Sequence, residues 1–255
     1  MDENILLSTK DLCAGYNKKQ ILHDISLEFE RGKITVIAGE NGCGKSTLLK
    51  SLIRIVPKTK GEIVVDGQNA ETLTSVQLAR KIAYLPQNKS IPDLTVMTMV
   101  LHGRFAHLSY PRRYRKEDLD AAQRALEITD LTEFADKKIS HLSGGTAQRV
   151  FLAMTLAQSS PVILMDEPTS FMDISHQMKF MELCKNLANS GKAVVMVLHD
   201  LPAALKYADK IILMSQGKVI SSGTPNQIFE SGSLDRAFNV NFKRVHTDNG
   251  DIYYC

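Results

Sequence analysis

The 255-residue sequence lacks any apolar run long enough to cross a bilayer, and its four cysteines form no paired motif. Its longest apolar stretches, Ile34 to Ala38, Val162 to Met165 and Ala193 to Leu198, fall far below the roughly 18 residues of a transmembrane helix. No CxxC pair and no His at metal-ligand spacing is found, so we expect reduced thiols. The acidic start lacks the basic region of a secretion signal, which predicts a cytoplasmic protein.

The sequence also has little excess charge. Lys and Arg number 31 against 28 Asp and Glu, and the net charge of +3 gives no argument for a nucleic-acid partner. Hydrophobic residues at 44% and charged residues at 23% are typical of a globular protein. There is no internal repeat, low-complexity segment or long linker. The one dense basic run, Pro111 to Lys116, is interpreted as a solvated loop before a helix or as a surface near anionic lipid or a membrane partner.

Periodicity along the chain predicts an α/β protein. Continuous apolar runs at Val162 to Met165 and Ala193 to Leu198 indicate strands buried on both faces of a parallel sheet. Asp248-Asn249-Gly250 predicts the turn of a terminal hairpin between strands at 243–245 and 252–254. Further strands are predicted over 5–8, 25–29, 33–38 and 61–68 (this last ended by the turn Asp66-Gly67), and helices over 46–55, 96–101, 116–129 and 146–157.

A glycine-rich loop lies between one predicted strand and the helix that follows it. Residues 39–46 read Gly-Glu-Asn-Gly-Cys-Gly-Lys-Ser and match G-x-x-x-x-G-K-[ST]. Glycines allow successive backbone N–H groups to curl around phosphate, and the helix N-terminus adds a favourable dipole. We expect Lys45 to reach the β- and γ-phosphates and Ser46 to ligate Mg²⁺. The alternative is a structural turn. Cys43 lies in this loop, and we predict that ATP shields it from alkylation.

Two buried strands end in polar residues. Val162 to Met165 is followed by Asp166 and Glu167, and such a strand-end acid is what a P-loop ATPase needs for Mg²⁺. Glu167 is then placed to orient or deprotonate the attacking water. Ala193 to Leu198 is followed by His199, at the strand end where open α/β sheets place their sites. We expect His199 to contact the γ-phosphate. The alternatives are that Asp166 and Glu167 are strand-end acids with no catalytic role and that His199 is a structural residue.

A second helix N-terminus suited to phosphate begins at Ser143. Residues 141–149 read His-Leu-Ser-Gly-Gly-Thr-Ala-Gln-Arg before an apolar helix. Because Lys45 and its neighbours already surround one nucleotide, a second cradle is explained if two copies pair head to tail. The run resembles the signature motif of ATP-binding-cassette (ABC) proteins, and the resemblance covers nearly the whole chain. It implies a P-loop (RecA-like) core with an antiparallel β subdomain and an inserted α-helical subdomain.

The resemblance also assigns roles to residues. Tyr16 looks like the aromatic residue that stacks on adenine, Gln87 like the Q-loop glutamine, and Asp173 like the D-loop aspartate. Thr146 stands where the signature usually has Gln, and Met172 where Leu commonly precedes the aspartate. The implied catalytic residues are Glu167, His199, Gln87 and Lys45, and the implied Mg²⁺ ligands are Ser46, Gln87 and Asp166. The implied nucleotide-binding residues are Tyr16, Gly39, Glu40, Asn41, Gly42, Cys43, Gly44, Lys45, Ser46, Thr47, Ser143, Gly144, Gly145 and Asp173.

Within the family, softer matches look like the ATPase subunits of iron-chelate importers for siderophores, haem or cobalamin. They are Leu78 to Gln87, Asp93 to Val96 leading to Gly103 to His107, Asp173 to Gln177, and the tail after Gly223-Thr224-Pro225. The resemblance implies an ATPase that uses ATP and Mg²⁺ as a dimer on the cytoplasmic face of the cell membrane. Its implied partners are a second copy, transmembrane permease subunits and, indirectly, a substrate-binding protein, with no nucleic acid.

One domain, 1–255, is expected. Its parts are a β subdomain with the P-loop (1–90), a helical subdomain (91–158), a second part of the core (159–225), and a terminal helix and hairpin (226–255). Alternatives remain an ABC ATPase for a different substrate, a non-transport ABC ATPase, and a P-loop GTPase or small-molecule kinase. The 56 positions from Gln87 to Ser143 leave no room for the long coiled coil of a non-transport ABC ATPase. No Asn-Lys-x-Asp motif, which reads guanine, supports a GTPase.

Overall fold

A computed structural model describes residues 3–17, 19–87, 89–170, 172–247 and 250–254. Its first sheet is antiparallel, with strand order β2-β1-β4-β5. Burial alternates along β2, so one face of this sheet packs inward and the other meets solvent. The strands are β1 (Ile5–Tyr16), β2 (Lys19–Glu30), β4 (Lys58–Val65) and β5 (Gln68–Asn69). The predicted antiparallel β region is therefore confirmed, and the turn at Asp66-Gly67 separates β4 from β5.

The second sheet has six strands in the order β10-β9-β3-β8-β7-β6. Strands β9, β3, β8, β7 and β6 run parallel, and β10 is antiparallel to β9. Every residue of β3, β7 and β8 is buried, which confirms the prediction of strands covered on both faces. The strands are β3 (Ile34–Gly39), β6 (Ile82–Leu85), β7 (Val162–Asp166), β8 (Ala193–Val197), β9 (Lys210–Ser215) and β10 (Lys218–Gly223).

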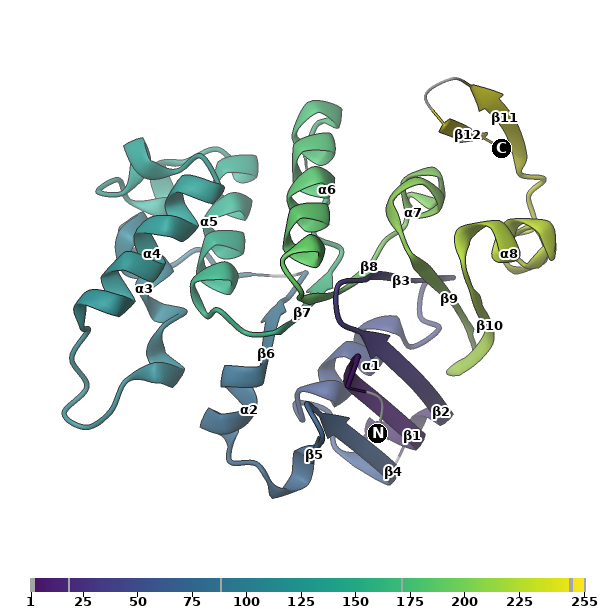
Figure 1. Ribbon diagram of the computed structural model, residues 1–255, viewed down its shortest axis with the longest axis horizontal. Coiled ribbons are helices and arrows are strands. Elements are labelled where there is room, and N and C mark those ends of the chain that lie inside the picture. Colours follow the sequence, from purple (N-terminus) through teal and green to yellow (C-terminus); the bar gives the residue numbers. More distant parts are fainter. Residues whose placement is uncertain (1–2, 18, 88, 171, 248–249, 255) are drawn as a thin grey trace.

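Alternate residues of the parallel strands belong to two hydrophobic cores. Val194 and Met196 of β8 pack in the core that contains α6 and α7, whereas Val195 and Val197 pack in the core that contains α1 and the first sheet. Figure 1 shows α6 and α7 on one side of the parallel sheet and the antiparallel sheet on the other. The helices of this part are α1 (Lys45–Leu52), α2 (Ser75–Lys81), α6 (Ile174–Asn189) and α7 (Leu201–Tyr207).

A layer of helices follows β6, at the left of Figure 1. It consists of α3 (Val96–His102), α4 (Lys116–Ile128) and α5 (Gly144–Ala157), with short 3₁₀ turns between them, and confirms the three predicted helices. The turns are Phe105–His107, Thr132–Phe134 and Ile139–His141; another, Ala70–Thr72, precedes α2. In the basic run before α4, Arg112 lies 4.5 Å from the centre of the Phe105 ring, and Arg115 donates to the Ser109 hydroxyl.

The chain ends in two short helices and a hairpin that lies beside α7. These are α8 (Pro225–Glu230), α9 (Ser233–Phe238), β11 (Lys243–Thr247) and β12 (Gly250–Tyr254). Residues 248–249 of the predicted turn lie outside the described residues. The hairpin itself is present in the predicted place. Among the helices of the described ranges, none is both long enough and apolar enough to span a membrane.

Candidate functional site at the carboxyl ends of the parallel strands

Four chain segments with predicted site residues emerge from the same edge of the parallel sheet. The phosphate loop follows β3, Gln87 follows β6, Glu167 follows β7, and His199 follows β8. Because these strands are parallel, their carboxyl ends meet at one edge, where ligands bind in open α/β sheets. Residues from distant parts of the sequence are therefore brought together by topology.

The phosphate loop closes around the side chain of Lys45. Its Nζ donates to the backbone oxygens of Gly39 at 2.7 Å and Glu40 at 2.9 Å, and the residue is only 6% exposed. Gly39, Gly42 and Gly44 all have positive φ. A Cβ at Gly39 would come within 2.2 Å of the Met214 oxygen, so the loop cannot take this path with another residue there. The N–H groups at the start of α1 complete a cradle for an anion.

Asp166 is held at the end of β7 on the face that points toward α1. Ser46 donates to its Oδ1 at 3.0 Å, and the Tyr84 hydroxyl donates to its Oδ2 at 3.4 Å. Burial raises the pKa of Asp166, the hydroxyl of Ser46 opposes the rise, and the charge of Glu167 adds to it. A hydroxyl beside a carboxylate offers the hard oxygen ligands that Mg²⁺ prefers, so this pair fits the metal. No cluster of three His, Cys, Asp or Glu suited to a metal occurs among the described residues.

Glu167 joins the loops after three strands. Its Oε2 accepts from Gln87 Nε2 at 2.5 Å, and its Oε1 lies 2.6 Å from Nε2 of His199. Ser170 also donates to Oε2 at 3.4 Å. The backbone of Glu167 has a φ of 48°, a left-handed conformation that costs about 1–3 kcal/mol outside glycine and clusters at functional sites. The predicted catalytic residues Glu167, Gln87 and His199 thus form one hydrogen-bonded group.

Ser143 lies at the N-terminus of α5, in the helical layer. Its Oγ accepts from the N–H of Thr146 at 3.3 Å and lies 2.9 Å from the Thr146 hydroxyl. A Cβ added to Gly144 or Gly145 would meet nothing within 4 Å, so no packing inside the subunit requires glycine there. Among the described residues, the side-chain bonds of Ser143 run to Thr146 and none joins it to the phosphate loop. Figure 1 shows α5 in the helical layer and α1, which follows the phosphate loop, in a separate part of the molecule.

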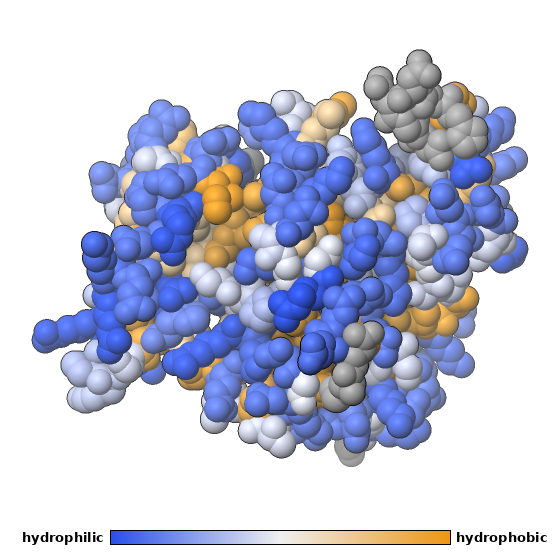
Figure 2. Space-filling view, in the orientation of Figure 1, coloured by the Kyte–Doolittle hydropathy of each residue, from blue (hydrophilic) through white to orange (hydrophobic). Residues whose placement is uncertain are grey.

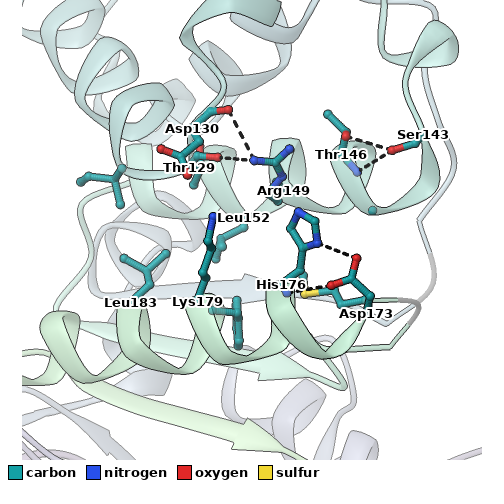
Figure 3. A pocket seen from close by; sticks show the side chains of 14 residues that line it. Thr129, Asp130, Ser143, Thr146, Arg149, Leu152, Asp173, His176, Lys179 and Leu183 are labelled. Carbon is teal, nitrogen blue, oxygen red and sulfur yellow. Dashed lines mark hydrogen bonds and ion pairs between the residues drawn. The ribbon is translucent and has the colours of Figure 1, made fainter.

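A cleft of about 320 Å³ separates α5 from α6 just behind Ser143 (Figure 3). Figure 2 shows hydrophobic surface beside α6, between it and the layer of helices. Asp173 lies at the rim and caps α6 by accepting from the N–H of His176 at 2.9 Å. Arg149 lines the cleft and donates to the backbone oxygens of Thr129 and Asp130, while its buried Nε has no hydrogen-bond partner among the described residues. Ser143 and Asp173 both line this cleft.

The other predicted residues have simple surroundings. Tyr16 ends β1 and is 44% exposed, so its ring is free to stack on a ligand. Glu40 and Asn41 are exposed, and Thr47 is partly buried in the first turn of α1. Cys43 is 6% exposed, and burial raises the pKa of its thiol, so alkylation needs the loop to open. Its shielding by ATP stays a prediction.

Three polar residues at this site were not predicted from the sequence. Tyr84 contacts Asp166 from β6, and its burial and the nearby carboxylate raise its pKa. The alternation of β6 could have placed Tyr84 on the face of the sheet that points toward α1. Lys89 and Gln148 are joined by a hydrogen bond, and burial lowers the pKa of Lys89 to about 8. No pattern in the sequence identifies this pair, because the two residues are 59 positions apart.

Comparison with known proteins identifies a family. The family model described as "ABC transporter" matches residues 22–170. Relatives include the petrobactin import ATP-binding protein FpuD of Bacillus anthracis, 39% identical over 92% of this chain and 86% of that protein. The ferric enterobactin transport ATP-binding protein FepC of Escherichia coli is 38% identical over 92% of this chain and 87% of that protein.

Solved structures give the same result. A chain from an inward-facing transporter, described as metal-chelate type, superposes with a TM-score of 0.84 at 27% identity, covering 98% of this chain and 96% of that chain. A bacterial ABC transporter cassette solved as a dimer has a TM-score of 0.75 at 29% identity, covering 86% of this chain and 99% of that chain. The predicted P-loop α/β fold is confirmed. The chain belongs to the ABC transporter family, and it is an ATPase subunit of that family.

Proposed function

We propose that two copies of this chain close on two Mg·ATP and use their hydrolysis to drive an importer of iron chelates such as siderophores, haem or cobalamin. The observation that carries the catalytic part is the contact of Glu167 with both Gln87 and His199, beside the bonded pair of Ser46 and Asp166. The iron-chelate part is supported by relatives named for import of petrobactin and transport of ferric enterobactin.

The phosphates of ATP would lie in the cradle formed by the loop and Lys45. The Nζ of Lys45 now bonds two backbone oxygens of its own loop, and an anionic phosphate is a stronger acceptor for an ammonium than a carbonyl. Ser46, Asp166 and Gln87 would hold Mg²⁺, which supplies charge neutralisation on the phosphate oxygens when bound. Tyr16 would stack on the adenine ring.

Glu167 would orient or deprotonate the attacking water. In the present arrangement its carboxylate accepts from Gln87 and lies within hydrogen-bond distance of His199. A γ-phosphate would compete for both groups and so release a carboxylate oxygen for water. Hydrolysis then depends on three loops that the parallel sheet already holds together.

The second half of each site would come from the partner copy. Ser143, Gly144 and Gly145 form an open helix tip with space beside each glycine, and Asp173 lies near it. The tip would close on the nucleotide held by the other subunit, in the manner of the head-to-tail pair predicted from the sequence. We further propose permease subunits in the membrane as partners, a substrate-binding protein as an indirect partner, and a location at the cytoplasmic face. We also propose that the single domain divides after residues 90, 158 and 225 into the four parts predicted from the sequence.

The ATPase mechanism is tested by replacing Glu167. Glu167→Gln keeps the shape of the side chain but removes the base, so turnover should fall by about 10²- to 10⁴-fold. ATP stays bound in this variant, and size-exclusion chromatography with Mg·ATP should show a dimer. Lys45→Ala should instead weaken binding of ATP itself and remain monomeric. Unchanged turnover in Glu167→Gln would exclude Glu167 from the mechanism.

The transport part is tested on the complex of this chain with its membrane subunits. We expect the ATPase rate of the reconstituted complex to rise when a binding protein loaded with a ferric siderophore is added. The same binding protein without iron chelate is the control. A complex that responds only to a substrate without iron would overturn the iron-chelate assignment and leave the ATPase assignment intact.

A further inference from the structure

A hydrogen-bonded chain connects the loop that carries Gln87, the helix that begins at Ser143 and the backbone next to Glu167. Lys89 Nζ donates to Oε1 of Gln148 at 2.6 Å. Gln148 Nε2 donates in turn to the backbone oxygen of Pro168 at 3.1 Å. The two bonds bridge segments 59 and 20 positions apart in the sequence.

The side chain of Gln148 is fixed at both ends. An amide has one acceptor oxygen and two donor hydrogens, and here the oxygen and the nitrogen each have a separate partner. Gln148 lies in the first half of α5, within one and a half turns of Ser143. Any rotation of α5 therefore displaces an amide that is bonded to Lys89 on one side and to Pro168 on the other.

The ammonium of Lys89 is poorly compensated apart from this bond. Among the described residues it has no carboxylate partner within 4.0 Å, and its nearest aromatic contact is the Phe151 ring, 5.3 Å from Nζ to centroid. A cation withdrawn from water without a counter-ion costs stability. Packing alone therefore does not explain a lysine at position 89. Its hydrogen bond to Gln148 is its strongest polar contact.

We propose that Lys89 and Gln148 are positioning residues for ATP hydrolysis. They connect the Gln87 loop, α5 and the strand end that carries Glu167 into one unit within a subunit. Closure of the Ser143 tip on the partner's nucleotide then moves Pro168 and so adjusts the neighbouring Glu167. This inference rests on the proposed ATPase mechanism, to which it adds a route from one site of a subunit to the other.

The test compares Lys89→Met, Gln148→Leu and the double variant with the unmodified protein. We expect each single variant to lower kcat by about 5- to 30-fold, the range for loss of hydrogen bonds to charged or buried groups. KM and the Kd for ATP should change less than about two-fold, because in the described part of the chain the side-chain hydrogen bonds of these two residues join them to each other and to Pro168, not to the phosphate loop. The double variant should be no slower than the worse single variant, since both changes break the same chain. Lys89→Arg restores a donor and should recover most of kcat.

Lys137→Met is the matched control. Lys137 also lies over an aromatic ring, with Nζ 4.6 Å from the Phe134 centroid, in the same helical layer. It should keep the unmodified kcat, and all variants should share one thermal midpoint within a few degrees. Unmodified kcat in Lys89→Met and Gln148→Leu, or strictly additive losses, would overturn this inference while the ATPase proposal stands. Absence of turnover in the unmodified protein would overturn the ATPase proposal first.

Discussion

Thr146 stands where the ABC signature usually has glutamine, and its hydroxyl lies within hydrogen-bond distance of Ser143. Thr146 Oγ1 lies 2.9 Å from Ser143 Oγ, and its N–H donates to the same oxygen. The two hydroxyls therefore fix each other's direction at the exposed tip of α5. Ser143 is expected to present its Oγ to the nucleotide of a partner subunit, so the orientation of this group matters for pairing.

Replacing Thr146 by Val tests this contact. Val keeps the branched shape but removes the hydroxyl, so one hydrogen bond of about 1 kcal/mol is lost. We expect the ATP-dependent dimer of Glu167→Gln to weaken by about five-fold, as measured by sedimentation at several protein concentrations. The matched control is Thr98→Val, because Thr95 and Thr98 form the same pair of hydroxyls, 2.8 Å apart, at the start of α3. Equal weakening in both variants would show that the effect is general helix capping.

At the scale of elements, the buried strands β7 and β8 were predicted from the sequence, whereas the buried strand β9 and the interrupted strands were not. Continuous apolar runs marked β7 and β8 because both faces of these strands are covered. Strand β1 extends to Tyr16, but only residues 5–8 were predicted. Positive φ at Asp11 and shifts in register between Thr9 and Leu12 break its alternation. Four-residue β6 follows α2 without a turn, and an apolar run of that length is ambiguous between helix and strand.

The parts of the site that could be predicted are those whose residues lie close together in the sequence. Glycines, Lys45 and the strand-end acids are local in sequence, so their chemistry could be inferred from spacing alone. The contacts of Glu167 with Gln87 and His199 join positions 80 and 32 apart, and they arise only because β6, β7 and β8 end at one edge. The bond between Lys89 and Gln148 depends on how α5 packs against the loop after β6, which no local pattern encodes.

A buried ion pair stabilises the helical layer. Arg104 Nε donates to Asp118 Oδ1 at 3.0 Å, with side-chain exposures of 10% and 7%, and Arg104 also donates to the backbone oxygen of Ala157. Burial favours the neutral acid, but the N–H of Arg115 and the guanidinium of Arg104 outweigh it and lower the pKa of Asp118. The pair thus connects the end of α3 to the start of α4 and the end of α5.

Asp118→Asn should therefore destabilise the protein at neutral pH. Removing one partner of a buried pair costs about 3–5 kcal/mol, and urea unfolding measures the change. A depressed pKa in the folded state contributes stability above the unfolded value of 3.8, which is lost as pH falls through the folded value. The difference between variant and unmodified protein should thus shrink below about pH 4. Asp93→Asn, in the exposed pair with Lys138, should change stability by less than about 1 kcal/mol. Equal effects of both variants would contradict this account.

At the scale of the whole molecule, the two predicted phosphate sites lie on different parts of the subunit, and their placement bears on whether two copies must pair. The phosphate loop and the Glu167 group lie at the edge of the parallel sheet, whereas Ser143 lies on the helical layer with space beside its glycines. Figure 1 shows α5 and α1 as separate parts of the molecule, in the helical layer and under the sheet. If the Ser143 tip closes on the partner's nucleotide as proposed, pairing of two copies would complete two sites.

Dilution tests this dependence on pairing. If only pairs hydrolyse ATP, turnover per subunit should fall as the protein is diluted, by about ten-fold for each ten-fold dilution where pairs are rare. The measurement is phosphate release at saturating Mg·ATP over three decades of protein concentration, with an inert carrier protein to prevent loss on surfaces. Glu167→Gln provides the parallel readout, since its pairs should persist to lower concentration. Constant turnover per subunit, with no paired Glu167→Gln at any concentration, would mean that one copy completes its own site.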